Sequence, residues 1–226
     1  FMALDLPHCT QSKPINMKRL TLSLVTVLIA SFTLQAQLNT TFGIKATPGF
    51  RTFHVKAESG GVEQVIDGSL FGVQAGGIVD LGFTPNFSIQ PQLLFAYKGG
   101  KLAGSYNANI IAIDVPINFL YKREGFFMGG GPNISYALSG KAEAESGGTD
   151  IDDLYEDNAT LTLKRFEIGA VINMGYTFPS GFTIATTYTR GLNDILDEGP
   201  DDYSMHTSQL GLTLGYMFGG KTAKKK

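Results

Sequence analysis

Acidic side chains gather in two stretches of the chain, and a dense group of carboxylates is well suited to bind a cation. Residues 143–157 include seven acidic residues and residues 194–202 include five, out of 20 in the chain. Such oxygen ligands suit Ca²⁺ or a divalent bridge to lipopolysaccharide. The spacing lacks the glycine of an EF-hand. Solvated acidic loops are therefore the favoured interpretation, and cation binding is the alternative. The candidate cation- or surface-binding residues are Asp150, Asp152, Asp153, Glu156, Asp157, Asp197, Glu198, Asp201 and Asp202.

Groups for acid–base or nucleophilic catalysis are scarce. The only histidines after residue 36 are His54 and His206, and a pair between His206 and Asp201 or Asp202 is the best catalytic candidate. Two histidines among many acidic residues make such a pair easy to obtain by chance. The one cysteine, Cys9, allows no disulfide framework. We therefore assign no catalytic residue and expect no enzyme activity and no cofactor.

The elements that would position these groups are strands, because apolar residues alternate with small or polar ones. In the last segment, Leu210, Leu212 and Leu214 alternate with Gly211 and Thr213. Successive side chains of a strand point to opposite faces, so each segment has one apolar face. Seven more segments show the pattern, near residues 42–47, 71–81, 87–98, 111–121, 126–139, 165–176 and 182–189. No stretch reaches the roughly 18 apolar residues of a spanning helix.

The connections between these segments alternate in length. Short turns are expected near residues 84–86, 122–125 and 179–181, and long loops over 51–69, 99–109, 140–160 and 191–205. Short periplasmic turns and long outer loops are typical of outer-membrane barrels. The sequence therefore predicts an all-β fold, an eight-stranded antiparallel transmembrane up-and-down β-barrel with both termini in the periplasm.

A soluble β-barrel would show the same alternation of apolar and polar residues. The residues at the ends of the apolar face distinguish it from a membrane barrel. Aromatic residues stand at both ends of the apolar face, as in the two girdles at the lipid–water interfaces. They are Phe42, Phe83, Phe87, Tyr121, Phe126, Tyr176, Phe182 and Phe218 at one end, and Phe71, Phe95, Tyr97, Tyr136, Phe166 and Tyr188 at the other. The opposite face has few charges, unlike a surface in water. The membrane barrel is therefore favoured over a lipocalin-like binder.

A few charges fall on the small, polar face that would line the lumen. A buried charge needs a partner, so three bases and three acids there predict a closed network of ion pairs. We expect this network to fix the strand register, with a proton or ion path as the alternative. An eight-stranded barrel is just filled by its side chains, so an open pore is not expected. The six residues are Lys45, Asp80, Lys98, Asp114, Arg165 and Glu167.

The N-terminal residues are expected to lie outside the barrel domain. Residues 17–36 have the basic start, apolar run and small residue of a signal peptide cleaved after Ala36. Residues 1–16 are expected to be an upstream extension, 37–218 the barrel domain and 219–226 a basic periplasmic tail. The net charge of −2 gives no reason to expect nucleic-acid binding.

Several segments resemble the PorT-like outer-membrane β-barrel family of Bacteroidota. They are 87–100 (FSIQPQLLFAYKGG), 113–117 (IDVPI), 129–132 (GGGP), 166–169 (FEIG), 188–195 (YTRGLNDI) and 214–218 (LGYMF). The chain departs from the family pattern at Gln92, where Glu is usual, and at Glu167, where Asp is commoner. The resemblance implies fold and location, and it transfers no catalytic residue. The family's namesake takes part in type IX protein secretion, so it also suggests an accessory role there.

Together these observations predict a monomeric, non-enzymatic barrel with a structural or outer-loop binding role. Its expected partners are outer-membrane lipid, lipopolysaccharide and proteins that contact the outer loops. An accessory role in protein secretion and a membrane-embedded hydrolase remain as alternatives.

Overall fold

The computed structural model describes residues 39–59, 62–102, 106–144, 151, 153–155, 162–198 and 203–219. The predicted upstream extension and signal peptide, and the predicted tail beyond Gly219, lie outside these residues. Within the described ranges, no helix is long and apolar enough to cross a membrane.

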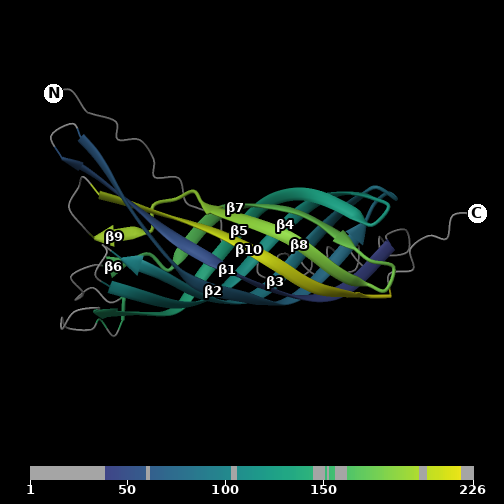
Figure 1. Cartoon of the computed structure of the whole chain (residues 1–226), viewed down its shortest axis with the longest axis horizontal. Coiled ribbons are helices and arrows are strands. Elements are labelled where there is room, and N and C mark those ends of the chain that lie inside the picture. The colour runs from purple at the N-terminus through teal and green to yellow at the C-terminus, as the bar shows by residue number, and fades with distance from the viewer. Residues whose placement is uncertain are drawn as a thin grey trace, which may run out of the picture. The chain divides into compact units, whose positions relative to one another are not determined.

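Eight strands close into an antiparallel barrel in the order β1-β10-β8-β7-β5-β4-β3-β2 (Figure 1). This closure confirms the predicted fold class. Strands β6 and β9 form a separate two-stranded sheet. The strands are β1 (Asn39–Ser59), β2 (Val62–Gly82), β3 (Phe87–Leu102), β4 (Tyr106–Arg123), β5 (Phe126–Ala144), β6 (Thr162–Leu163), β7 (Phe166–Thr177), β8 (Phe182–Gly191), β9 (Leu196–Glu198) and β10 (Tyr203–Phe218).

The alternation along each strand separates an apolar outer wall from a polar inner wall. In β4, Ile111 and Phe119 are exposed on the outside, while Asp114 and Asn118 are fully buried in the lumen. Burial alternates in the same way along β7 and β8. A strand with period two can only present its two kinds of side chain in this way. The register therefore sets which charges enter the lumen.

The two ends of the barrel differ, and we name them by their connections. The turn end carries the tight connections at 83–86, 124–125 and 178–181, together with the start of β1 and the end of β10, where Phe42 pairs with Phe218. The other end is the loop end. Glu124 and Gly125 both have positive φ, as a two-residue hairpin turn requires. The three predicted tight turns are confirmed.

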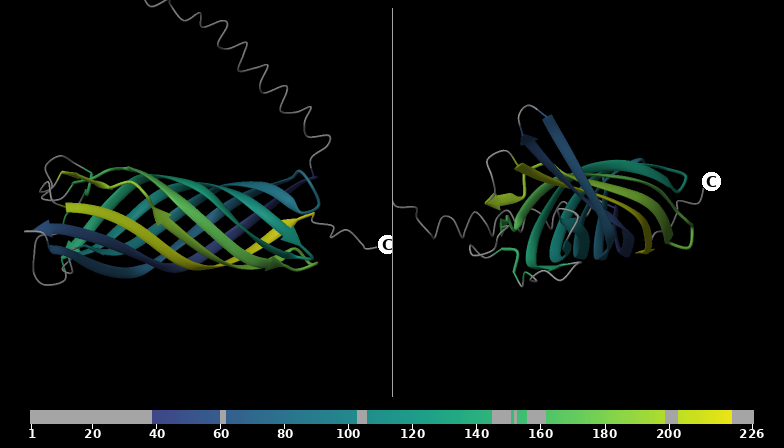
Figure 2. Two further views of the ribbon diagram at one scale, coloured as in Figure 1. Left: turned by 90° about the horizontal axis from the view of Figure 1, so that it is seen from above. Right: turned by 60° about the vertical axis from the view of Figure 1, so that its left-hand side comes forward.

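The predicted loops 51–69 and 99–109 are wrong, because the strands continue through most of both stretches. β1 and β2 are each 21 residues long and pair as far as Ser59 and Val62. The first hairpin extends beyond its neighbours at the loop end (Figures 1 and 2). The polar residues in this stretch obscured a continuing alternation, since Phe53 and Val55 still point inward and are buried.

Candidate functional site

The middle of the lumen is crossed by hydrogen-bonded charges centred on Lys98. The Lys98 Nζ donates to Asp114 Oδ1 at 2.6 Å and to Ser135 Oγ at 2.7 Å, and it lies 3.9 Å from Glu167 Oε2. Both Lys98 and Asp114 are almost completely buried. Charge-assisted bonds of this length are among the stronger hydrogen bonds in proteins.

Further side chains extend this group to strands on the other side of the barrel. Arg51 Nη2 donates to Glu167 Oε2 at 3.0 Å, and Thr207 also donates to Glu167. Gln74 Nε2 donates to Asp114 Oδ2 at 2.7 Å and, at 3.3 Å, to Gln209 Oε1. We call this set the ionic belt: Arg51, Gln74, Lys98, Asp114, Ser135, Glu167, Thr207 and Gln209.

The ionic belt contains three of the six charges predicted for the lumen. Lys98, Asp114 and Glu167 lie in it, and Lys45 is buried and interacts electrostatically with Asp114. Asp80 is also buried, but it pairs with Lys122 near the turn end and forms no part of the belt. The predicted single network is therefore two separate groups of charges.

Arg165 lies at the mouth of the lumen, where it lines a small cavity together with Lys98 and Glu167, but it does not belong to the ionic belt. It precedes β7, which begins at Phe166, so the alternation of the strand does not extend to it. Its guanidinium donates to the carbonyl of Leu138 at 3.0 Å and lies 3.6 Å from a carboxylate oxygen of Asp153. The arginine that hydrogen-bonds to Glu167 is Arg51, which the sequence assigned to a loop. The inward phase of Lys45, Thr47 and Gly49, continued by two residues, was the signal that would have identified it.

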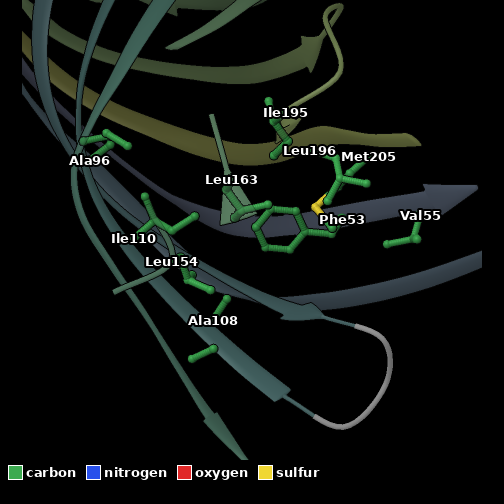
Figure 3. Close-up of a cluster of buried hydrophobic side chains, with 13 residues drawn as sticks. Phe53, Val55, Ala96, Ala108, Ile110, Leu154, Leu163, Ile195, Leu196 and Met205 are labelled. Carbon is green, nitrogen blue, oxygen red and sulfur yellow. The ribbon is translucent and has the colours of Figure 1, made fainter. Parts of the chain in front are cut away.

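Above the ionic belt, toward the loop end, apolar side chains pack into the mouth of the barrel (Figure 3). Some come from the barrel wall and others from the segments between strands. Leu154 and Phe53 are fully buried. We call this set the apolar plug: Phe53, Val55, Ala96, Ala108, Ile110, Ala112, Ala137, Ala142, Leu154, Leu163, Ile195, Leu196 and Met205.

Backbone hydrogen bonds hold the segments of the plug in place. Ile151 and Ala142 exchange N–H···O bonds of 2.8 and 2.9 Å, and the N–H of Leu163 donates to Leu154 at 2.8 Å. Arg165 lies 4.5 Å above the ring of Tyr155, and burial raises the pKa of the Tyr155 phenol. These contacts satisfy polar groups that would be costly to bury alone.

A small cavity lies between the belt and the plug. It measures about 20 Å³ and is lined by Arg51, Lys98, Tyr155 and Glu167 among others. A polar space of this size holds roughly one water molecule. The lumen is thus closed by two successive layers, one ionic and one apolar.

Comparison with known proteins agrees with this architecture. Residues 31–197 match the family model described as "Outer membrane protein beta-barrel domain". The chain belongs to this family. It is accordingly a protein of the bacterial outer membrane, and its apolar outer wall faces lipid.

Solved barrels from several bacteria are similar to this outer-membrane barrel. Neisserial surface protein A is 12% identical with a TM-score of 0.44, over 77% of this chain and 96% of that one. The attachment invasion locus protein Ail of Yersinia pestis, in complex with a heparin analogue, is 13% identical with a TM-score of 0.38, over 77% and 99%. OprG of Pseudomonas aeruginosa is 13% identical with a TM-score of 0.37, over 78% and 95%. No curated protein matches the chain.

Most of the predicted acidic binding residues lie outside the described residues: Asp150, Asp152, Glu156, Asp157, Asp201 and Asp202. Of the others, Asp153 accepts the N–H of Tyr155 and pairs with Arg165, so it stabilises the turn of the third loop. Asp197 is exposed in β9, which also contains Glu198. In the described part of the barrel, no three His, Cys, Asp or Glu side chains could together hold a metal ion.

The two candidate histidines are neighbours on adjacent strands near the loop end. His54 of β1 lies opposite His206 of β10 in the register. The His54 Nε2 and the Ser208 Oγ are 2.7 Å apart. Asp201 and Asp202, which the sequence paired with His206, are outside the described residues.

Proposed function

We propose that this barrel is a non-enzymatic outer-membrane protein that does not conduct solutes and acts through structure or through binding at its loop end. The observation that carries the proposal is the double closure of the lumen by the ionic belt and the apolar plug. Buried charges joined by hydrogen bonds across the lumen favour one arrangement of the side chains and fill the path that water would take. The side available for partners is then the outside of the barrel, above all the loop end.

We propose that the barrel has no catalytic activity because of the surroundings of His54 and Ser208, the pair that most resembles a catalytic base and nucleophile. His54 and Ser208 lie on neighbouring strands whose backbone N–H groups serve the β-ladder between β1 and β10. A serine hydrolase needs free N–H donors for the oxyanion beside its nucleophile. A flat, paired sheet does not offer them, so a structural hydrogen bond accounts for this contact.

Orientation is part of the proposal, with the turn end in the periplasm and the loop end outside the cell. Lipopolysaccharide and surface ligands would then meet the loop end, where exposed acidic residues such as Glu143 and Asp197 lie. Carboxylates there would recognise lipopolysaccharide phosphates only through bridging divalent cations.

Cysteine labelling in intact cells tests this orientation. Because Cys9 precedes the predicted cleavage site, the mature chain is expected to contain no cysteine. We expect Glu143→Cys to react with a membrane-impermeant maleimide in intact cells and Ser180→Cys, in the turn before β8, to react only after the outer membrane is opened. The reverse pattern would refute the orientation.

An accessory role in protein secretion is the second candidate, favoured by the resemblance of residues 87–100 and 188–195 to PorT-like barrels. Purification of the tagged barrel from detergent-solubilised outer membrane distinguishes this secretion role from a structural or binding role. A stoichiometric set of co-purifying envelope proteins would favour secretion, and recovery of the barrel alone would exclude it.

A further inference from the structure

The outer wall of the barrel has a hollow near the turn end, on β3, β4 and β5. The hollow has a volume of about 440 Å³. Its lining is apolar and includes Phe83, Phe87, Ile89, Phe119, Tyr121 and Met128. All of these side chains are at least partly exposed on the lipid-facing wall. We call this hollow the outer slot.

The strand register sets which outward side chains lie side by side at the slot. Two rows of outward residues cross the three strands, one through Phe87, Tyr121 and Met128 and the next through Ile89 and Phe119 to Gly130. At Gly130 the second row lacks a side chain. A Cβ added there would lie 2.3 Å from the carbonyl oxygen of Val171, so the strands approach too closely for a larger residue.

The walls of the slot are held by paired aromatic rings. The rings of Phe87 and Tyr121 pack edge to face with centroids 5.3 Å apart, as expected for cross-strand neighbours. The slot is therefore a fixed feature of the girdle, whose shape is set by backbone register and ring packing.

A positive charge stands at the end of the slot that is nearer to water. Arg123 follows Tyr121 by two residues, so it faces the same side of β4, about 7 Å farther toward the turn end. Its side chain is exposed, and it pairs in the register with Phe126 of the girdle. A long basic side chain at this depth reaches the level of the lipid phosphates.

From this combination we propose that the outer slot binds one phospholipid molecule. An acyl chain occupies the hollow between Phe87, Phe119 and Met128, and the phosphate accepts hydrogen bonds from the Arg123 guanidinium. Lipid tails are as apolar as the wall, so the chain is retained by close packing in the hollow and not by the hydrophobic effect. The guanidinium adds a charge-assisted contact to the phosphate.

This proposal extends the proposed function and depends on it only for the leaflet. With the turn end in the periplasm, the lipid comes from the periplasmic leaflet. The slot itself is present whichever way the barrel is inserted, so lipid binding in detergent tests it separately from orientation.

Native mass spectrometry of the whole barrel released from detergent tests the site, with phosphatidylglycerol as the probe and diacylglycerol as the matched lipid without phosphate. We expect one phosphatidylglycerol to be retained more strongly than diacylglycerol. Arg123→Gln should weaken that first binding roughly ten-fold, the usual effect of losing one charge-assisted hydrogen bond. Met128→Trp should abolish this binding, because it fills the slot with a side chain that is common in aromatic girdles.

The control variants carry the same kinds of substitution at positions outside the slot. Met174 lies directly opposite Met128 on β7 and is similarly exposed to lipid, but does not line the slot, so Met174→Trp should bind lipid as the unaltered barrel does. Lys164→Gln removes an exposed charge at the loop end. Heat-modifiable gel mobility confirms that each variant is folded. Equal lipid retention in all four folded variants, or equal retention of both lipids, would overturn the proposal.

Discussion

Replacing Lys98 with methionine is expected to lower the free energy of unfolding by about 3–5 kcal/mol, the usual effect of breaking a buried ion pair. The change removes the cation that contacts Asp114 and Ser135 and lies near Glu167. Asp114 would remain almost fully buried, and it would keep the hydrogen bond from the neutral Gln74 amide. A carboxylate that stays in a low-dielectric lumen without its cation accounts for the loss.

The measurement is urea unfolding of the barrel in lipid vesicles, followed by gel mobility and far-UV circular dichroism. The chain contains no tryptophan whose fluorescence could report unfolding. The double variant Lys98→Met/Asp114→Asn should recover part of the loss, because it removes both charges together. Glu143→Gln, on an exposed acid at the loop end, should change stability by less than about 0.5 kcal/mol. A Lys98→Met barrel as stable as the unaltered one would show that the ionic belt does not hold the lumen together.

Truncating Phe53 to alanine is expected to cost about 3–5 kcal/mol, the range for removing a fully buried aromatic ring. The Phe53 side chain is fully buried in the apolar plug. It also touches the layer below, because the Arg51 guanidinium lies 5.5 Å from the centroid of its ring. A Cβ added at Gly100 would be 1.9 Å from the ring, which shows how closely the ring packs against β3.

Unfolding in urea and limited proteolysis of the loop end measure this effect together. Phe53→Leu keeps most of the apolar volume and should lose less than about 1.5 kcal/mol. If Phe53→Ala left both the unfolding midpoint and the proteolysis rate unchanged, the plug would not be a packed layer.

The sequence predicted the parts of the barrel that follow from period-two alternation. It predicted eight barrel strands, the sides on which Lys98, Asp114 and Glu167 point, and the tight turns. Each of these depends only on neighbouring residues along one strand. The outer girdles are equally local, because one face of each strand carries its aromatic residues.

Pairing between charges was harder to predict, because it depends on register across strands distant in the sequence. Arg51 and Glu167 are 116 residues apart, and nothing in either segment indicates the other. Arg165 shows the opposite error, since the sequence included it in the network of lumen charges although its partners are Leu138 and Asp153. Lys122 was assigned to a turn although its side chain reaches Asp80.

The apolar plug could not be predicted from a pattern. Leu154 and Leu163 stand in a stretch dominated by acidic and polar residues, without a period that indicates burial. Their backbones bond to Gly140 of β5 and pair with Leu196 of β9, and nothing in the local sequence indicates these contacts.

The central claim is that the lumen is closed by the ionic belt and the apolar plug. Single-channel recording of the purified, folded barrel in planar lipid bilayers tests it most directly. The closed lumen predicts no unitary current steps over a range of applied voltages and salt concentrations. Reproducible steps of uniform conductance from the unaltered barrel would contradict it.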